Sequence, residues 1–260
     1  MERIVFASDF HLGINGAVTS EEREKLLVRW IEEVAMSASE VFLLGDIFDF
    51  WFEYKKAIPK GFVRFQGALA ALTDSGVPVH LFIGNHDMWI FDYFREEFNI
   101  NLYRKPHIFE RQGRKLLIGH GDGLGPGDHT FKVIRRVFHS PAMIGLFRWV
   151  HPDFGIRVAH AWSNSSRAGH GDIYQYHGPS REYLLSYCEE QSALSPDIDY
   201  FVFGHRHLVF DYLLSNGHSR YINIGDWLQF NSYAVLEQGD IHLRSYDNTP
   251  LRIITNETTF

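Results

Sequence analysis

The 260-residue chain has only one cysteine, Cys188. It can therefore form neither an intrachain disulfide nor a zinc site built from cysteines. It also lacks any apolar run approaching the roughly 18 residues that a membrane-spanning helix needs. Its first ten residues, MERIVFASDF, contain no extended apolar stretch and no small-residue cleavage site of the kind found in secretory signals. We therefore expect a protein of a reducing, cytoplasmic compartment that does not cross a membrane.

Basic charge is scarce, with 25 Lys and Arg residues against 32 Asp and Glu, a formal net charge of −7. Proteins that coat nucleic acid need a basic surface to bind phosphates, so nucleic acid is not an expected partner. Histidine, the commonest metal ligand, is by contrast abundant at 15 residues. The hydrophobic content of 45% is that of a folded protein, and the length suits one domain covering residues 1–260 with an insertion.

The order of the predicted elements indicates an α/β fold. Short apolar runs predict buried strands at residues 3–8, 41–44, 77–83, 115–118 and 199–203. Thr19 and Glu22 have the spacing of a capping box ahead of a helical repeat, and a second helix is expected near 60–73. Strands first alternate with helices and later follow one another directly. This order predicts a sandwich of two mixed β-sheets flanked by helices, interrupted by a mainly helical insertion at 124–176.

Five short polar motifs each follow a predicted strand. Ligands in open α/β folds collect at the carboxyl ends of strands, so these motifs can converge on one site. Carboxylate, imidazole and amide oxygen donors without thiolate favour manganese, iron or zinc. Asp46 is the best candidate to bridge two ions, which in two-metal sites lie roughly 3.5–4 Å apart. A single Asp-x-His is a weak signal, but five motifs in order are a strong one: Asp9-Phe10-His11, Gly45-Asp46-Ile47-Phe48-Asp49, Gly84-Asn85-His86-Asp87, Gly119-His120-Gly121-Asp122 and Gly204-His205-Arg206-His207.

These motifs resemble the signature of the calcineurin-like metallophosphoesterase superfamily over residues 3–123 and 196–228. The resemblance implies one ion held by Asp9, His11, Asp46 and His207, and a second held by Asp46, Asn85, His120 and His205. It implies that His86 contacts the scissile phosphate or acts as an acid, with Asp87 orienting it. Asp49 and Asp122 would fix the ligand imidazoles, as groups behind metal ligands usually do.

The segment 125–170 carries six basic residues against two acidic ones, a charge of +4 within a chain of −7. Phe131, Ile134 and Phe138 follow a helical repeat, as do Phe154, Val158 and Trp162, so amphipathic helices are expected. They have two interpretations. The helices pack on the sheet with their basic residues in solvent, or they form a lid that holds acyl chains and contacts an anionic membrane surface.

A closer resemblance rests on the motif order, the length and an insertion ending in Ser163-Asn164-Ser165-Ser166-Arg167. The chain is similar to the UDP-2,3-diacylglucosamine pyrophosphohydrolase family of lipid A biosynthesis, peripheral inner-membrane enzymes of Gram-negative bacteria that use manganese. The resemblance implies that a metal-bridging hydroxide attacks the α-phosphorus, releasing UMP and 2,3-diacylglucosamine 1-phosphate. The implied substrate contacts are Asn85, His86, Arg157, Asn164, Ser165 and Arg167.

One departure keeps other functions open. Well-known members of that family carry arginine at the position of His86. A sugar-phosphate leaving group departs with little need for a proton, whereas an alkoxide needs a general acid. His86 therefore also fits a two-metal phosphodiesterase or phosphatase acting on another nucleotide or phosphoester. A further alternative is a non-catalytic scaffold with a phosphoesterase fold, although every ligand position is filled here. No motif indicates an oligomeric state.

Overall fold

The computed structural model describes residues 2–126, 129–158 and 174–259. The strands are β1 (Arg3–Ala7), β2 (Glu40–Leu43), β3 (Val79–Phe82), β4 (Asn101–Tyr103), β5 (His107–Arg111), β6 (Arg114–Ile118), β7 (Tyr200–Phe203), β8 (Val209–Leu213), β9 (Arg220–Ile224), β10 (Ser232–Glu237), β11 (Asp240–Ser245) and β12 (Ile253–Ile254). The helices are α1 (Ser20–Glu33), α2 (Val63–Asp74), α3 (Tyr93–Phe98), α4 (His129–Phe138), α5 (Pro141–Phe147) and α7 (Tyr183–Leu194), with single 3₁₀ turns at Ala35–Ser37 and Pro179–Arg181.

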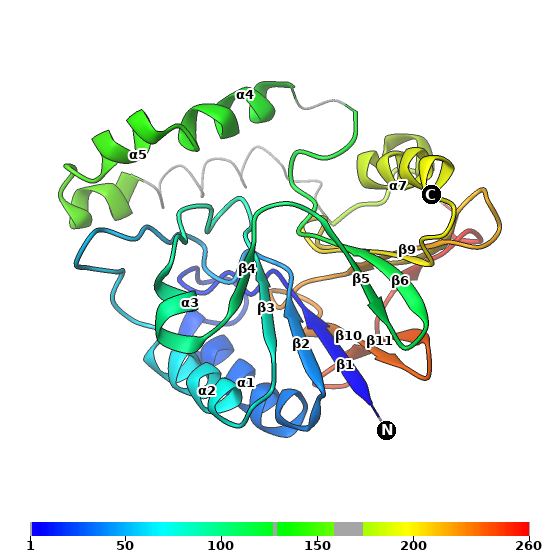
Figure 1. Cartoon of the computed structure of the whole chain (residues 1–260), viewed down its shortest axis with the longest axis horizontal. Helices are drawn as coiled ribbons and strands as arrows, with labels where there is room; N and C mark the ends of the chain where they lie inside the picture. The colour runs from blue at the N-terminus through cyan, green and yellow to red at the C-terminus, as the bar shows by residue number, and fades with distance from the viewer. Residues whose placement is uncertain (1, 127–128, 159–173, 260) are drawn as a thin grey trace.

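Twelve strands of the described chain form two six-stranded sheets (Figure 1). The first has the order β11-β10-β1-β2-β3-β4, and the second β12-β8-β9-β7-β6-β5. Both are mixed: β1 to β4 are parallel and β10 is antiparallel to β1, while β6, β7 and β9 are parallel and β5 is antiparallel to β6. The predicted sandwich of two mixed sheets flanked by helices is confirmed.

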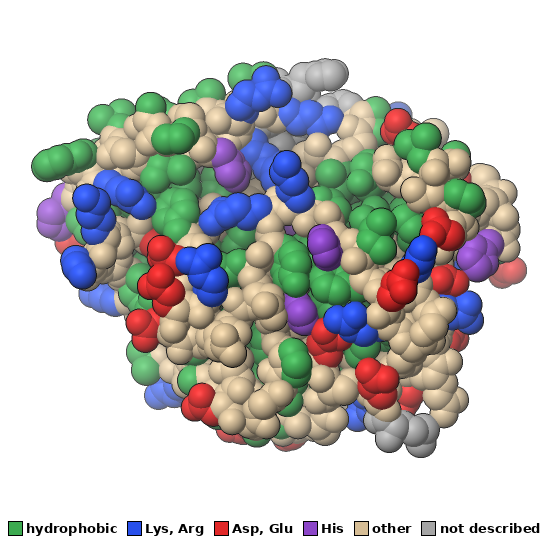
Figure 2. Space-filling model, in the orientation of Figure 1, with side chains coloured by type: hydrophobic (Ala, Val, Ile, Leu, Met, Phe, Trp, Pro, Cys, Tyr) green, Lys and Arg blue, Asp and Glu red, His purple; other side chains and the backbone are tan. Residues whose placement is uncertain are grey.

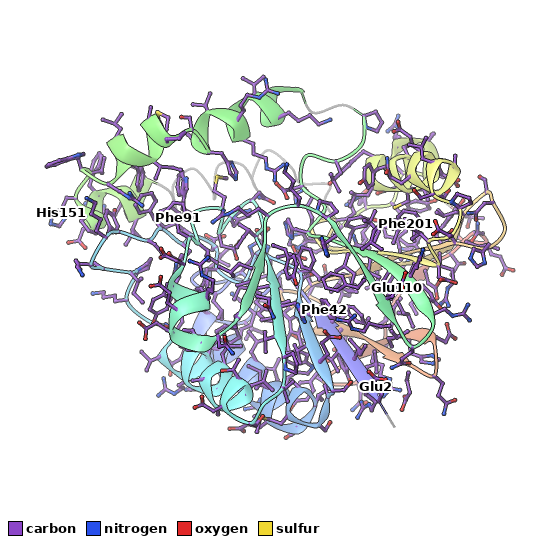
Figure 3. The ribbon with its side chains drawn as sticks, in the orientation of Figure 1. Glu2, Phe42, Phe91, Glu110, His151 and Phe201 are labelled. Carbon is purple, nitrogen blue, oxygen red and sulfur yellow. The ribbon has the colours of Figure 1, made fainter. Side chains whose placement is uncertain are left out.

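The side-chain alternation of a strand explains why the central strands read as continuous apolar runs. In β1, Ile4 and Phe6 face the core between the two sheets, whereas Val5 and Ala7 face the layer of α1 to α3. Phe42 lies in the same inter-sheet core (Figure 3), stacked on Phe6 with ring centroids 5.2 Å apart. A central strand buried on both faces has no polar position to alternate with.

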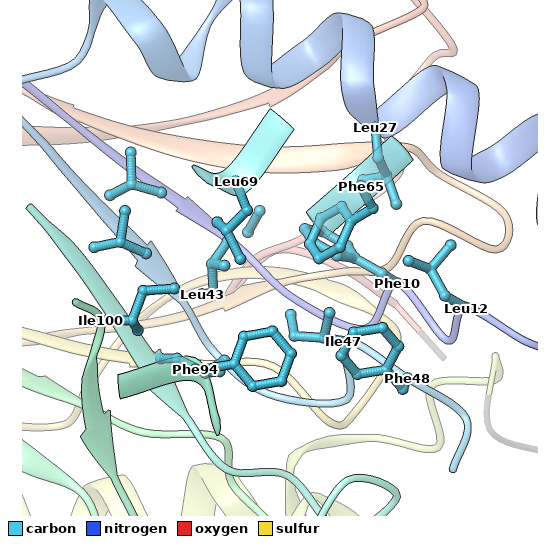
Figure 4. Close-up of a cluster of buried hydrophobic side chains, with 14 of the residues drawn as sticks. Phe10, Leu12, Leu27, Leu43, Ile47, Phe48, Phe65, Leu69, Phe94 and Ile100 are labelled. Atoms are coloured by element: carbon cyan, nitrogen blue, oxygen red, sulfur yellow. The ribbon is translucent and has the colours of Figure 1, made fainter. Parts of the chain in front are cut away.

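Helices cover the outer face of each sheet. Leu27 of α1 and Phe65 and Leu69 of α2 pack with Leu43 of β2 in the cluster shown in Figure 4. The helix α7 covers the second sheet, where the buried Cys188 packs with Phe201 and Phe203. The predicted capping box of α1 is also present, with Thr19 and Glu22 bonding each other's backbone N–H groups.

The described chain between β6 and α7 includes helices, with non-helical residues at 119–126 and 174–178. It contains α4, α5 and a helical stretch at 152–158. In Figure 1, α4 and α5 lie on the side of the sheets opposite the N-terminus, and β1 runs from that terminus toward them. Aromatic contacts attach the segment: the Phe147 ring stacks on Trp89 at 5.1 Å and lies 4.6 Å from Phe52. The action of this segment as a lid remains a prediction.

An ion pair between buried Glu40 and half-buried Arg111 joins the two sheets. Glu40 of β2 accepts two hydrogen bonds from Arg111 of β5, at 2.6 and 2.7 Å, and is 2.7 Å from His80 Nε2 of β3. Burial raises the pKa of Glu40, but the hydrogen bonds from Arg111 and His80 outweigh burial and lower it from 4.5 to about 2.

This lowered pKa predicts how the pair affects stability at different pH values. The ionised Glu40 stabilises the folded state fully above its unfolded pKa of 4.5, and the contribution is lost as the pH falls toward about 2. At neutral pH we expect Glu40→Gln to lower the free energy of unfolding by about 1–3 kcal/mol, because it weakens charge-assisted hydrogen bonds. Urea unfolding of both proteins at a series of pH values measures the difference.

The matched control is Glu110→Gln on the same strand as Arg111. Glu110 is exposed and lies 3.6 Å from Lys115, so we expect a change within about 0.5 kcal/mol at every pH. The free energies of unfolding of the parent and Glu40→Gln should converge on acidification. A difference that stays constant would contradict the assignment of this stability to the charged pair.

Candidate metal centre

The polar motifs leave their strands through an unusual backbone conformation. Asp9, His11, Asp46, His205 and His207 all have positive φ, between 44° and 65°. Residues other than glycine rarely adopt this left-handed region, and such strain concentrates at functional sites. Hydrogen bonds between neighbouring turns hold it in place, from Asp9 N to Gly45 O at 3.0 Å and from His11 N to Asp46 O at 2.9 Å. The left-handed turns bring side chains from distant parts of the sequence to one place.

The first group of potential ligands consists of Asp9, His11 and His207, all buried. The two Nε2 atoms of His11 and His207 are 3.3 Å apart, and Asp9 Oδ1 is 3.7 Å from the first and 3.5 Å from the second. The other carboxylate oxygen of Asp9 is 2.5 Å from Ser8 Oγ and accepts a hydrogen bond from His205 N at 2.9 Å. Asp9 is therefore oriented by one oxygen while the other faces the two imidazoles.

The second group consists of Asp46, His120 and His205. Asp46 Oδ2 is 3.4 Å from His120 Nε2 and 3.7 Å from His11 Nε2, so one carboxylate oxygen lies between the two groups. Asp46 Oδ1 accepts a hydrogen bond from His86 N at 2.8 Å. Asn85 Oδ1 is 3.2 Å from His120 Nε2, which places the amide oxygen in the same group. The structure thus brings together all seven residues for which metal binding was predicted.

His86 and Asp49 lie beside the first group. The His86 ring meets the His11 ring edge to face at 4.8 Å, and His86 forms a further potential ligand group with His11 and Asp46. His86 Nδ1 is 3.1 Å from the backbone carbonyl of Asp49 and 3.5 Å from its carboxylate. The same carboxylate lies 3.8 Å from His11 Nδ1, and its role in fixing this imidazole stays a prediction.

Two glycines allow the loops to approach the carboxylates. A Cβ atom on Gly84 would collide with the backbone and carboxylate of Asp46, and one on Gly204 would collide with Ser8 and Asp9. Neither position has room for a side chain. The glycines of these motifs therefore serve close packing of one motif against another, as well as the turn itself.

The electrostatics of the cluster favour positive charge. Burial raises the pKa of Asp9, but His207 and His11 outweigh burial and lower it to about 2. Burial lowers the pKa of His11 and of His120, but the carboxylates of Asp49 and Asp9 beside His11, and of Asp46 beside His120, raise both to about 10. His205 differs: burial and the neighbouring His120 lower its pKa to about 3. Cations and protons compete for such a site, because ligands bind metal in their deprotonated form.

Buried donor atoms that lack hydrogen-bond partners also suit this site to a divalent ion. Among the described residues, the buried atoms Asp9 Oδ1 and His11 Nδ1 have no hydrogen-bond partner. Buried polar atoms without partners are costly, and a coordinated ion supplies the missing interaction at the oxygen. Oxygen and nitrogen donors without thiolate suit manganese, iron or zinc. The residues present therefore fit divalent ions.

Two expected contacts differ in the structure. Asp87 does not lie against the His86 ring: its carboxylate accepts hydrogen bonds from Gly84 N and Ile47 N, both at 2.8 Å, and so joins two of the motif loops. Asp122 does not fix His120. It pairs with Arg135 of α4 at 2.9 Å, and the Leu44 carbonyl accepts from His120 Nδ1 at 2.6 Å instead. A backbone carbonyl at a strand end carries no signature in the sequence.

Sequence reasoning also missed Asp226. This buried carboxylate lies 2.9 Å from His207 Nδ1, on the side of the ring away from Asp9. A signal was available, since Gly225-Asp226 follows β9 as Gly45-Asp46 follows β2, and Gly225 also has a positive φ.

Only some of the predicted substrate contacts lie in the described part of the chain. Arg157 is exposed on the helical stretch 152–158, and among the described residues it has no hydrogen bond or ion pair with the cluster. Asn164, Ser165 and Arg167 lie outside the described residues. Within the described chain, no helix is both long and apolar enough to cross a membrane.

A two-sheet sandwich with aspartates, histidines and an asparagine gathered at the strand ends is the architecture of a phosphoesterase. The sequence profile of calcineurin-like phosphoesterases matches residues 2–209, and the chain belongs to that family. It is 33% identical to a UDP-2,3-diacylglucosamine hydrolase of Porphyromonas gingivalis over 95% of this chain and 98% of the relative. A protein of the same name from Serratia proteamaculans is 27% identical over 86% and 90%. A hypothetical protein from Pyrococcus horikoshii shares the fold, with a TM-score of 0.50 at 9% identity over 94% of this chain and 88% of that one.

The close packing at Gly84 predicts the effect of adding one methyl group. We expect Gly84→Ala to weaken binding of divalent ions by about tenfold or more, because the methyl group displaces the Asp46 carboxylate. Titration of the metal-free protein with Mn²⁺ in a calorimeter measures this. Gly67→Ala on α2, where nothing lies within 4 Å of the new methyl group, is the matched control and should bind like the parent. Equal affinity in all three proteins would show that Asp46 is not a ligand.

Proposed function

We propose that this protein hydrolyses the pyrophosphate bond of UDP-2,3-diacylglucosamine, giving UMP and 2,3-diacylglucosamine 1-phosphate. The observation that carries the substrate is the 33% identity, over nearly the full length of both chains, to a relative named UDP-2,3-diacylglucosamine hydrolase. The geometry of the candidate metal centre supports the chemistry, because two ligand groups share the carboxylate of Asp46. Under this proposal the reaction is a hydrolysis of a phosphorus anhydride bond.

We assign one ion to Asp9, His11, Asp46 and His207, and the second to Asp46, Asn85, His120 and His205. Manganese is the proposed metal, with iron or zinc as alternatives that the same donors serve. When bound, such a pair of ions activates water and stabilises charge on the attacking and leaving oxygens. Asp46 is the residue that sets the separation of the two positions, because one of its oxygens faces His11 and His120 at 3.7 and 3.4 Å.

The chain's own residues orient the reactants. His86 is partly buried at the edge of the first ligand group, with Nδ1 directed at the Asp49 carbonyl at 3.1 Å. We propose that the other ring nitrogen, Nε2, contacts the phosphoryl group. Burial lowers the pKa of His86, while the negative charges of Asp46 and Asp49 oppose the decrease. The Asp49 carbonyl can only accept, so Nδ1 carries a proton, and Nε2 donates a hydrogen bond to phosphate only when the ring is the protonated imidazolium.

His86 also supports a second candidate function, hydrolysis of another nucleotide or phosphoester. A sugar 1-phosphate leaves with little need for a proton, whereas an alkoxide leaving group requires a general acid in the position of His86. The two functions share the ions and the attack, and differ in the leaving group. Product analysis therefore separates them more clearly than metal content.

The first test is incubation of the purified protein with UDP-2,3-diacylglucosamine and Mn²⁺, with both products followed by mass spectrometry. We expect UMP and the diacylated sugar 1-phosphate. Asp46→Asn should lower kcat/KM by about a thousandfold or more, because it removes the charge shared by both ion positions. Chelation with EDTA should abolish turnover, and Mn²⁺ should restore it.

The deacylated sugar nucleotide is the control substrate. Acyl chains bound away from the reacting phosphorus support the chemical step, so we expect their removal to lower kcat/KM strongly. Cleavage of a generic phosphodiester without cleavage of the lipid would sink the substrate assignment and favour the second candidate. Absence of any phosphoesterase activity in a metal-loaded protein would favour the scaffold interpretation.

We further propose that the segment 124–176 is a lid over the metal centre and contacts an anionic membrane surface. Contacts between this segment and the rest of the chain support its position: Arg135 pairs with Asp122, and Trp89 donates to Phe138 O at 3.0 Å. On the face shown in Figure 2, Lys and Arg side chains are interspersed with hydrophobic ones over α4 and α5.

Exposed apolar side chains support the membrane contact. Trp149 is 91% exposed, and Leu146 and Phe154 are each 63% exposed, beside the exposed Arg148 and Arg157. His151 lies at the same outer end of the segment in Figure 3. Apolar side chains next to basic ones are the composition of interfacial segments that bind anionic lipids. The enzyme would then meet its lipid substrate on the cytoplasmic face of the inner membrane.

The membrane contact predicts an effect of removing one aromatic side chain. We expect Trp149→Ser to weaken binding to phosphatidylcholine vesicles containing phosphatidylglycerol by about tenfold, the equivalent of roughly 1.4 kcal/mol. Co-sedimentation measures it, and vesicles without the anionic lipid should bind weakly. The matched control is Leu194→Ser on α7, a residue 71% exposed at a distance in the chain from this segment. Equal losses for both variants would refute a specific membrane surface at the segment.

A further inference from the structure

Asp226 is a fully buried carboxylate that belongs to none of the potential ligand groups. Its position is fixed by the backbone, because Oδ1 accepts hydrogen bonds from Gln229 N at 2.9 Å and Phe230 N at 3.2 Å. Oδ2 is directed the other way and lies 2.9 Å from His207 Nδ1. The carboxylate is thus held rigidly behind one of the imidazoles of the metal centre.

This contact determines which ring nitrogen of His207 carries the proton. A carboxylate at 2.9 Å selects the ring form in which Nδ1 carries the proton, and so leaves the lone pair on Nε2. Nε2 then faces the metal centre, 3.5 Å from Asp9 Oδ1 and 3.3 Å from His11 Nε2. The negative charge of Asp226 also makes the imidazole a stronger donor.

The same oxygen of Asp226 has a second partner, Tyr174. The Tyr174 hydroxyl donates to Asp226 Oδ2 at 3.0 Å, and its ring meets the His207 ring edge to face at 5.9 Å. Tyr174 belongs to the end of the segment 124–176, while Asp226 follows β9. One carboxylate oxygen therefore receives hydrogen bonds from a metal-centre imidazole and from the segment proposed to form the lid.

Two donors to one oxygen compete for its electron density. Each hydrogen bond to a carboxylate stabilises its charged form and makes it a weaker base. Donation from Tyr174 therefore weakens the pull of Asp226 on the Nδ1 proton of His207, and His207 becomes a poorer ligand. Loss of that donation has the opposite effect.

We propose that His207, Asp226 and Tyr174 form a hydrogen-bonded relay through which Tyr174 sets the affinity of the Asp9–His11–Asp46–His207 position for its ion. Asp226 and Tyr174 are positioning residues, with Asp226 strengthening the ligand and Tyr174 restraining it. The relay rests on the proposed function to the extent that the cluster binds divalent ions. It adds a route by which movement of Tyr174 changes the metal centre without contact to the ion.

The test is calorimetric titration of the metal-free protein with Mn²⁺, without substrate, in the parent, Asp226→Ala, Asp226→Asn and Tyr174→Phe proteins. We expect Asp226→Ala to weaken the binding of one of the two ions by about 10- to 100-fold. Asp226→Asn keeps an acceptor oxygen and should fall between. Tyr174→Phe should bind that ion about two- to fivefold more tightly, and should have no effect in the Asp226→Ala background.

A second readout is the absorption spectrum of the Co²⁺-loaded proteins, which reports the donor strength of His207. The spectra of Tyr174→Phe and Asp226→Asn should shift in opposite directions from the parent. Tyr176→Phe, two residues along the same segment, should match the parent in both measurements. Asp226→Asn keeps the test valid where Asp226→Ala fails to fold.

The outcomes separate the relay from the proposed function. A parent protein that binds no divalent ion overturns the metal centre itself. A parent that binds two ions with unchanged affinity in the Asp226 variants overturns the relay alone. Weaker binding in Tyr174→Phe also overturns it, because a purely structural hydroxyl would lower the affinity on removal.

Discussion

The buried negative charge of Asp9 and Asp46 is the constraint on which the rest of the site depends. Two carboxylates removed from water need positive charge nearby, and several imidazoles lie close to both of them. Two of those imidazoles are in turn held by groups further out, His120 by the Leu44 carbonyl and His207 by the Asp226 carboxylate. Divalent ions satisfy the arrangement more fully than protons, because a single ion can be shared by several of these donors.

Strained backbone conformations hold these charged side chains in place. Left-handed turns at Asp9, His11, Asp46, His205 and His207 cost free energy that stable packing beneath must offset. Buried Arg23 shows how: its guanidinium donates to the carbonyls of Phe10, His11 and Ile14, at 2.7 to 2.8 Å, and fixes the first of these turns. The buried hydrophobic cluster in Figure 4 contains Phe10 and Phe48, which follow Asp9 and Asp46 in the chain.

Much of this could be predicted from the sequence because its signals are local. Buried strands, the capping box at Thr19 and motifs at strand ends depend on residues close together in the chain, and all are confirmed. The contacts that could not be predicted from the sequence depend on packing. The partners of Asp87 and Asp122 are backbone N–H groups and Arg135 of α4, and the ring of His120 is fixed by a carbonyl. Such contacts are set by three-dimensional neighbours rather than by residue type or spacing.

The most direct measurement of the central claim is a crystal structure of the Mn²⁺-loaded protein with anomalous scattering data at the manganese absorption edge. The account predicts two anomalous peaks joined by the Asp46 carboxylate. One should lie among Asp9, His11 and His207, and the other among Asn85, His120 and His205. Absence of both peaks, or peaks away from Asp46, would contradict a metal centre built on this carboxylate.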